Sequence, residues 1–235
     1  MASKKEKRKT QARRRRNARR SARSGFPRAG LLIGVVVVAL VVVAALVLLD
    51  QGAAGSSAGA DVAAPEKVLG AANAPVEVVV YLDYQCPYCG RFATGPEQQL
   101  RQEYVDSGQV RFVVRNLAFI GDESTWAAEA AACAAEQDRF WDYHDKLFAE
   151  QGAENSGAYS RDNLKRFAAE LGLDTASFDQ CLDSDRYESS VRDERAEAQR
   201  RQIRATPTLL VNGRLIENGA NYTVLQAAIE AALAQ

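Results

Sequence analysis

The sequence predicts an α/β domain in which a helical block separates two groups of strands. Residues 76 to 83 and 109 to 116 are runs of apolar and β-branched residues, and the first is continuous enough for a strand buried on both faces. A helical pattern then extends from Asp122 to about Arg204, and a hairpin pattern follows at residues 208 to 216. Strands on both sides of a helical block indicate one sheet with a helical insertion.

The first half of the domain passes directly from strand to helix. The first strand leads into Cys86, and the pattern from Pro87 to about Val105 is helical. Proline suits the first helical position, whereas Pro96 is expected to kink the helix. A turn at Ser107-Gly108 precedes the second strand.

The helical block and the C-terminal part also carry boundary signals. Helix starts are indicated at Asp122 or Ser124, at Ser160 and at Asp174, and a stop at Gly172. Thr208 to Val211 and Arg214 to Ile216, joined by Asn212-Gly213, are typical of a β-hairpin with a primed turn. Tyr222 to Leu233 is expected to close the chain as a helix.

Charge is divided sharply along the chain. The 235 residues are 47% hydrophobic and 26% charged, enough for one globular domain and accessory segments. Residues 1 to 28 hold 13 Lys and Arg against one acid, which leaves 17 basic and 29 acidic residues in the remainder. This division predicts that the two parts meet different surroundings.

A membrane segment is predicted between these parts. Residues 29 to 49 contain no charged, Asn, Gln, Ser or Thr side chain, and 21 apolar residues are enough to cross a bilayer as a helix. A cleaved signal peptide is the alternative, with small residues at 58 to 60, but its apolar region is normally only about 7–15 residues long. We therefore favour an uncut, single-pass signal-anchor. The basic excess before it places the N-terminus in the cytoplasm and the rest of the chain outside.

The remaining N-terminal segments have simple interpretations. The basic tail has the charge to bind nucleic acid, but a topology signal on an acidic membrane surface is favoured and nucleic acid is an unlikely partner. Residues 50 to 64, rich in Ala, Gly and Ser, predict a flexible linker. The folded domain is therefore expected at residues 65 to 235.

The chemistry is predicted at Cys86-Pro87-Tyr88-Cys89. Two cysteines at this spacing at a strand-to-helix junction can form and break a small disulfide ring. The helix start favours an anion, which predicts a lowered pKa and a reactive thiolate at Cys86, with Cys89 resolving mixed disulfides. A zinc site or a plain structural disulfide is the alternative. Because zinc needs about four ligands and the chain has one His, no metal is predicted.

A second candidate is Thr206-Pro207, just before the predicted hairpin. An X-Pro bond adopts the cis form at modest cost. A cis-proline loop would leave the Thr206 backbone available to bind an extended substrate peptide by strand-like hydrogen bonds.

Together these features resemble the DsbA-like branch of the thioredoxin superfamily, including its membrane-anchored, BdbD-like members. The resemblance rests on four segments in the family's order: residues 70 to 76, 81 to 89, 140 to 145 and 206 to 213. It implies a thioredoxin fold with a helical insertion at about 122 to 204, a redox-active Cys86/Cys89 pair and a cis Pro207.

Two features depart from the family's pattern. Val80 stands where better-known members have a buried acid, and Asp83, the nearest acid, is interpreted as structuring the loop rather than carrying a proton. The Pro87-Tyr88 dipeptide of the active-site loop also resembles glutaredoxins, so it leaves the direction of electron flow open.

Other candidate residues lie in the helical insertion. Cys133 and Cys181 complete an even cysteine count in an exported domain, which favours a structural disulfide over two buried thiols or a second redox relay. His144 is interpreted as a hydrogen-bonded packing residue rather than a proton shuttle.

The leading functional hypothesis is a thiol-disulfide oxidoreductase that introduces disulfides into reduced, unfolded exported proteins. The resemblance implies reoxidation by a membrane quinone-linked partner and requires no cofactor. A membrane-anchored reductase or isomerase is the enzymatic alternative. A thioredoxin-fold peptide-binding module is the non-enzymatic one, although pure binding needs neither sulfur.

Overall fold

The computed structural model of the chain describes residues 67–235. The predicted basic tail, transmembrane segment and linker lie outside these residues. Within residues 67–235, no helix combines the length and the apolar character that a membrane span requires.

The domain has the predicted order of strands, helical insertion, hairpin and final helix. Its strands are β1 (Val68–Leu69), β2 (Val76–Leu82), β3 (Val110–Asn116), β4 (Thr208–Val211) and β5 (Arg214–Ile216). Its helices are α3 (Pro87–Ala93), α4 (Pro96–Leu100), the π-helical η1 (Arg101–Val105), α5 (Asp122–Ala135), α6 (Phe140–Ala149), α7 (Arg161–Glu170), α8 (Thr175–Asp183), α9 (Glu188–Arg200) and α10 (Tyr222–Leu233).

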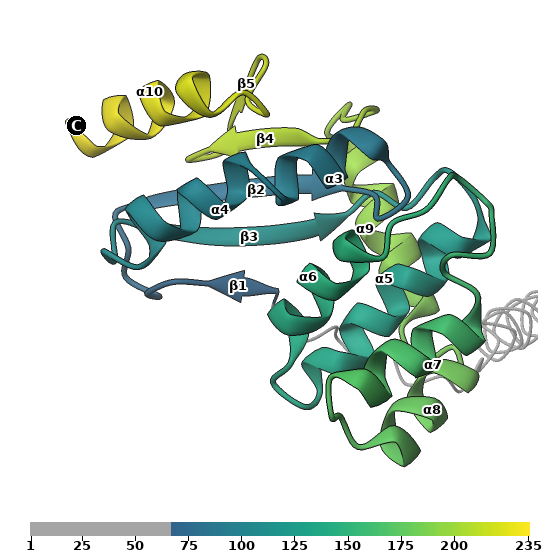
Figure 1. The fold of residues 1–235 in the computed structure, drawn as a ribbon. Coiled ribbons are helices and arrows are strands. Elements are labelled where there is room, and N and C mark those ends of the chain that lie inside the picture. The colour runs from purple at the N-terminus through teal and green to yellow at the C-terminus, as the bar shows by residue number, and fades with distance from the viewer. Residues whose placement is uncertain (1–66) are drawn as a thin grey trace, which may run out of the picture. The chain divides into compact units, whose positions relative to one another are not determined.

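The five strands form one mixed sheet in the order β1-β3-β2-β4-β5 (Figure 1). The central strands β2 and β3 are parallel, and every other neighbouring pair is antiparallel. On β2, Val80 stands opposite Val114 of β3 and Leu209 of β4. The hairpin strands β4 and β5 have the predicted bounds.

The central strand is buried on both faces, as its continuous apolar run predicts. Val80 packs in the core cluster that includes Ile229 of α10, whereas its neighbour Val79 packs in a second cluster with Ala198 of α9. Successive side chains of a strand point to opposite faces of the sheet, so a strand covered on both faces needs apolar residues at every position and not at every second one. This burial fixes the strand that leads into the cysteine pair.

The helical insertion comprises α5 to α9 and joins β3 to β4, with α5 to α8 gathered to one side of the sheet (Figure 1). Its predicted starts are confirmed at α7 and α8, where the side chains of Ser160 and Asp174 accept hydrogen bonds from backbone N–H groups of the first turn. Gly172 follows α7 with a left-handed φ of 72°, which suits glycine after a helix end.

Two local features differ from the prediction. Pro96 does not merely kink one helix: α3 ends at Ala93, and Pro96 starts the separate helix α4 after Gly95. Proline lacks an N–H for the helix interior but is suited to the first position. The two-residue strand β1 was not predicted because it is too short to show a period of two.

Candidate active site

Cys86 and Cys89 lie where β2 passes into α3. The Cys86 N–H donates to the Asp83 carbonyl oxygen (3.0 Å) and closes the connecting turn. Cys86 is the N-cap of α3, with extended backbone (φ −71°, ψ 120°), and Pro87 occupies the start of the helix as predicted. Both cysteines are buried, with 6% of Cys86 and 1% of Cys89 exposed.

The two thiols differ strongly in acidity. A hydrogen bond from the Cys89 thiol is the largest effect lowering the pKa of Cys86, to about 5; burial opposes it, and the Thr206 side chain and the backbone N–H groups of Cys89 and Tyr88 add to it. Burial raises the pKa of Cys89 well above its ordinary value, and its hydrogen bond to Cys86 acts in the same direction. At neutral pH Cys86 is therefore a thiolate and Cys89 a thiol.

The Thr206–Pro207 loop lies against the Cys86 sulfur. The Thr206–Pro207 peptide bond is cis, and Cys86 Sγ lies 3.4 Å from the Thr206 carbonyl oxygen. That contact suits a protonated thiol as donor. The Thr206 hydroxyl is buried and has no hydrogen-bond partner within residues 67–235, so it is available to donate to the Cys86 thiolate. Pairing of β4 with β2 brings these distant residues together.

An open groove of about 530 Å³ lies beside the pair, between α3 and the hairpin. Its lining includes Tyr88, Phe92, Pro207 and Leu215. Tyr88 is 64% exposed and Leu215 62% exposed, so the groove presents apolar surface to solvent. A groove of similar volume between the sheet and α9 is lined mainly by charged side chains and includes neither Tyr88 nor the Thr206–Pro207 loop.

Asp83 structures the loop that precedes the cysteines, as expected. One carboxylate oxygen accepts from the Ser124 hydroxyl (2.7 Å) and the Gln85 N–H (2.9 Å). The other accepts from the N–H groups of Phe119 (2.9 Å) and Ile120 (3.2 Å). The bond to Gln85 lies within the active-site loop, and the other three tie this loop to the segment between β3 and α5 and to the start of α5.

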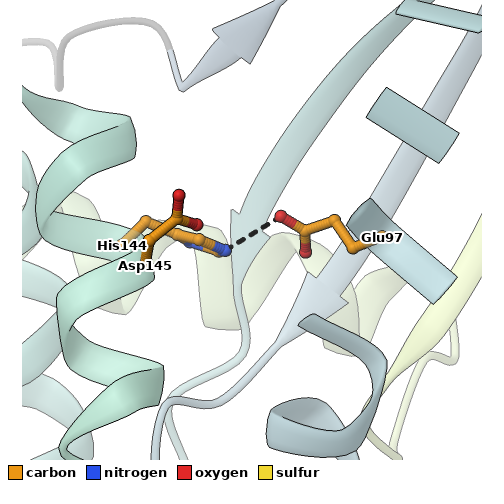
Figure 2. A group of neighbouring side chains, drawn as sticks. All are labelled: Glu97, His144 and Asp145. Atoms are coloured by element: carbon orange, nitrogen blue, oxygen red, sulfur yellow. Dashed lines mark ion pairs between the residues drawn. The ribbon is translucent and has the colours of Figure 1, made fainter. Parts of the chain in front are cut away.

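His144 is a buried, hydrogen-bonded residue, as the sequence favours. Its Nδ1 is 3.1 Å from the Tyr84 hydroxyl, and its Nε2 is 3.2 Å from Glu97 Oε1, where Figure 2 shows the two side chains facing one another. Burial raises the pKa of Glu97, but His144 and Arg101 outweigh it, so this pKa is lowered.

Glu97, His144 and Asp145 are close enough together to suggest a metal site. Arg101, however, forms ion pairs with both Glu97 and Asp145, and its guanidinium stacks 4.4 Å from the Trp141 ring centre. Because an arginine already balances the two carboxylates, we interpret this group as an ionic cluster between α4 and α6.

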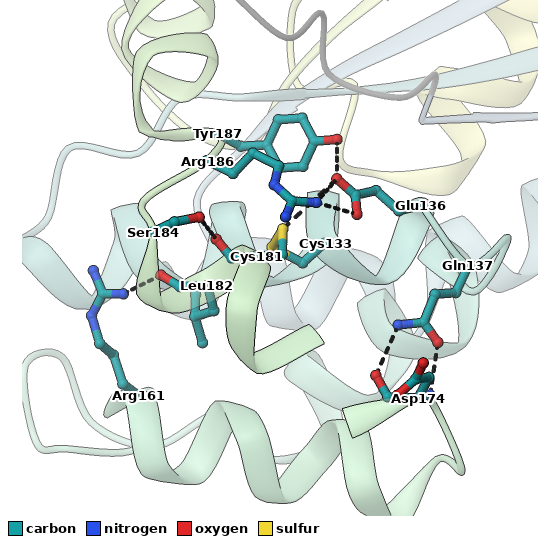
Figure 3. Close-up of a disulfide and its surroundings, with 10 residues drawn as sticks. All are labelled: Cys133, Glu136, Gln137, Arg161, Asp174, Cys181, Leu182, Ser184, Arg186 and Tyr187. Carbon is teal, nitrogen blue, oxygen red and sulfur yellow. Dashed lines mark hydrogen bonds and ion pairs between the residues drawn. A yellow bond between two sulfur atoms is a disulfide. The ribbon is translucent and has the colours of Figure 1, made fainter. Parts of the chain in front are cut away.

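Cys133 of α5 and Cys181 of α8 form a disulfide (Figure 3). Both residues are at most 1% exposed, and 48 positions separate them in sequence. Beside the bridge, Glu136 accepts from the Tyr187 hydroxyl (2.6 Å) and pairs with Arg186 (2.7 Å). The disulfide therefore links the first helix of the insertion to its later part.

Sequence reasoning missed two amide side chains that touch the active-site loop, Gln151 and Asn155. Gln151 Nε2 donates to the Cys86 carbonyl oxygen (3.1 Å), and Asn155 Oδ1 accepts from Gln85 Nε2 (3.3 Å). The one available signal was Gly90, because a glycine inside a helix frequently marks a close contact.

The sheet, the helical insertion and a CxxC pair beside a cis-proline loop define the class: a thioredoxin-fold protein equipped for thiol-disulfide chemistry. The family model described as thioredoxin matches residues 63–231. The chain is 32% identical over 168 residues to disulfide bond formation protein D of Bacillus subtilis, covering 70% of this chain and 76% of that protein. The crystal structure of oxidised BdbD from Bacillus subtilis superposes with a TM-score of 0.68 at 31% identity, covering 74% of this chain and 97% of that one. The chain therefore belongs to the DsbA-like branch of the thioredoxin family.

A further relative places a similar domain in a larger protein. The Na(+)/H(+) antiporter NhaA 3 of Salinispora tropica is 36% identical over 171 residues, which are 72% of this chain. The chain spans about a quarter of the antiporter's length. The match is confined to that quarter and indicates a related thioredoxin domain within the antiporter.

Proposed function

We propose that this chain is a thiol-disulfide oxidoreductase that introduces disulfides into exported proteins through Cys86 and Cys89. The observation that carries the proposal is the split acidity of the pair, with a Cys86 pKa of about 5 and a Cys89 pKa well above its ordinary value. A protein that only binds peptides does not require two thiols whose pKa values are shifted in opposite directions.

The reaction starts from the oxidised pair. A substrate thiolate attacks Cys86 Sγ, the Cys86–Cys89 bond breaks, and Cys89 leaves and takes up a proton, as its raised pKa favours. A second substrate thiolate then attacks the substrate sulfur of the mixed disulfide and expels Cys86 as a thiolate. The substrate loses two electrons to form its disulfide, and the cysteine pair gains them.

The low pKa of Cys86 favours the oxidising direction. A stabilised thiolate is a good leaving group, and stabilising the reduced form makes the disulfide a stronger oxidant. Thr206 and Pro207 are proposed to bind an extended substrate segment, and Pro87 and Tyr88 to shape the loop beside the groove. A reductase or isomerase remains the second candidate, favoured by the glutaredoxin-like Pro87-Tyr88 dipeptide.

The proposed setting is the outer face of a cell membrane. We propose that residues 29 to 49 anchor the chain, that residues 1 to 28 stay in the cytoplasm, and that residues 65 to 235 act outside it. The proposed partners are reduced, unfolded exported proteins as substrates and a membrane quinone-linked protein that reoxidises the pair.

The equilibrium of the Cys86/Cys89 pair with glutathione tests the direction of the reaction. About 30 mV corresponds to a tenfold change in this equilibrium for a two-electron couple. We expect a potential well above about −200 mV, in the range of oxidising members of the superfamily. A potential near that of thioredoxin, about −270 mV, would instead support the reductase.

The individual roles of the sulfurs are tested by substitution. Cys86→Ser should abolish exchange, because the attacked sulfur is lost. Cys89→Ser should accumulate mixed disulfides with substrate proteins in cells, because the Cys86 thiolate still attacks substrate disulfides and expels a substrate thiolate, while no Cys89 thiol remains to release the adduct. Adducts are counted on non-reducing gels, and their absence with Cys89→Ser would contradict substrate oxidation by this pair.

A further inference from the structure

Gln151, the second residue after α6, contacts the active-site loop from the helical insertion. Its Nε2 donates to two carbonyl oxygens of that loop, those of Tyr84 (2.6 Å) and Cys86 (3.1 Å). The Cys86 oxygen also accepts the Gly90 N–H (3.1 Å), the bond that begins α3. Gln151 therefore holds the peptide group of the reactive cysteine from outside the redox helix.

Gly90, directly after Cys89, provides the space that this contact needs. A Cβ at position 90 would lie 2.2 Å from Gln151 Oε1 and 3.0 Å from its Cδ. These atoms form the end of a flexible side chain, so an added methyl group would push the Gln151 amide aside rather than move the backbone. Gln151 and Gly90 are thus matched partners.

Asn155, four residues later, also contacts the active-site loop, through the Gln85 side chain. The Asn155 N–H donates to Gln85 Oε1 (2.6 Å), and Asn155 Oδ1 accepts from Gln85 Nε2 (3.3 Å). A Cβ on Gly121 would lie 2.1 Å from Asn155 Oδ1. Residues 151–155 therefore contact the active-site loop at two points. At each point a side-chain amide lies close to a glycine, Gln151 to Gly90 and Asn155 to Gly121.

We propose that Gln151 is a positioning residue of the redox reaction: by holding the Cys86 carbonyl, it keeps the Cys86 sulfur beside the N–H groups of Tyr88 and Cys89. The bond also withdraws negative charge from a carbonyl oxygen that belongs to the same residue as the thiolate. Both effects stabilise the thiolate. The inference rests on the proposed function and adds a residue of the insertion to the machinery of the pair.

The test compares Gln151→Ala, Gly90→Ala and the double variant, with Gln98→Ala as matched control. Gln98 also donates a side-chain amide to a backbone carbonyl, that of Ala93 (3.0 Å), but does not touch the active-site loop. The readouts are the pKa of Cys86, from the ultraviolet absorbance of the thiolate against pH, and the glutathione equilibrium of the folded protein.

Both single variants should raise the pKa of Cys86 by about 0.5 to 1 unit, and each unit is a tenfold change in thiolate stabilisation. The glutathione equilibrium should shift about threefold to tenfold toward the oxidised pair, because the reduced form loses stability. The double variant should match Gln151→Ala, since the three atoms nearest to a Cβ at position 90 all belong to the Gln151 amide that this substitution removes. Gln98→Ala should behave as wild type.

An unchanged Cys86 pKa in both single variants would overturn the inference, as would fully additive effects. Alanine favours helices more than glycine does, so a shift in Gly90→Ala cannot come from loss of α3. If Gln151→Ala fails to fold, Gly90→Ala carries the test alone. Failure of the proposed function is distinct, because wild-type protein would then already lack an oxidising potential.

Discussion

Cys86 and Cys89 lie three positions apart, yet their surroundings move their acidities in opposite directions. The pKa of Cys86 is lowered most by Cys89 and further by the Thr206 side chain and by backbone N–H groups, whereas burial raises the pKa of Cys89, which is 1% exposed. Hydrogen bonds favour the charged form and burial disfavours it. The position of each sulfur relative to the helix start and to the Thr206–Pro207 loop therefore assigns the two roles.

The acidity of Cys86 predicts the pH dependence of its reactivity. In the reduced protein, the rate of alkylation by iodoacetamide should rise with pH and reach half its plateau near pH 5 rather than near the ordinary value of 9.0. Cys89 should stay unmodified at neutral pH, as mass spectrometry of the alkylated protein would report. A half-point above pH 8 would contradict the thiolate described above.

Glu129, on α5, predicts that the stability of the fold depends on pH. It is 1% exposed, and neither carboxylate oxygen has a hydrogen-bond partner within residues 67–235. Burial, with the charge of Asp185, raises its pKa from 4.5 to about 7. The folded state therefore holds a proton that the unfolded state releases, and this group makes stability fall as pH rises from about 4.5 to 7.

Glu129→Gln should remove this loss of stability at higher pH. We expect the variant to be more stable than wild type by roughly 2 to 3 kcal/mol at pH 8 and nearly equal to it at pH 4, in urea unfolding at both values. Glu123→Gln on the same helix is the control. Its buried carboxylate accepts the N–H groups of Gly157 and Tyr159 (2.8 Å each), so this variant should be destabilised at pH 8. An equal effect of Glu129→Gln at both pH values would contradict the assignment.

At the scale of elements, one covalent link holds helices of the insertion together, and an ionic cluster joins the insertion to the helices after the active-site loop. The Cys133–Cys181 disulfide joins α5 to α8, and the ionic cluster of Glu97, Arg101 and His144 joins α4 to α6. These links hold in place the insertion, which contains Gln151. The geometry at Cys86 therefore depends on how the insertion packs.

Removing the disulfide should weaken the domain without abolishing exchange. In the chain-entropy model, a closed loop of 48 residues contributes about 4 kcal/mol. We expect a loss of that order in urea unfolding for Cys133→Ala with Cys181→Ala, while the glutathione equilibrium of Cys86/Cys89 stays near wild type. Because either single substitution already opens the bridge, the second should add little. Loss of redox activity in a folded double variant would contradict a purely structural bridge.

At the scale of the whole molecule, the proposed function depends on the side of the membrane that Cys86 occupies. Cytosolic thiols are kept reduced, whereas an exported domain can keep its disulfides. Protease added to cells stripped of their wall should remove the domain after Asp50 and leave residues 1 to 28 protected. Thiol labelling without reductant should find Cys133 and Cys181 blocked. An intact chain with four reactive thiols would reverse the orientation.

The sequence by itself determined the local elements and pointed to the proposed reactive pair. Periodicity and turn residues predicted β2, β3, the hairpin and α10, and helix caps marked α7 and α8. The CxxC spacing at a strand end indicated Cys86 and Cys89 as the candidate redox pair. These features depend on residues a few positions apart, whose preferences are visible in one chain.

Only the tertiary structure decided which distant groups meet the pair. The Cys86 sulfur faces Thr206, 120 positions away, and the Cys86 carbonyl accepts from Gln151, 65 positions away. The partner of His144 on the active-site loop, Tyr84, is 60 positions from it. Such contacts arise from how β4 and the insertion pack against the loop after β2, and no local periodicity encodes that packing. The acidity of Cys86 is thus a property of the folded assembly of these segments.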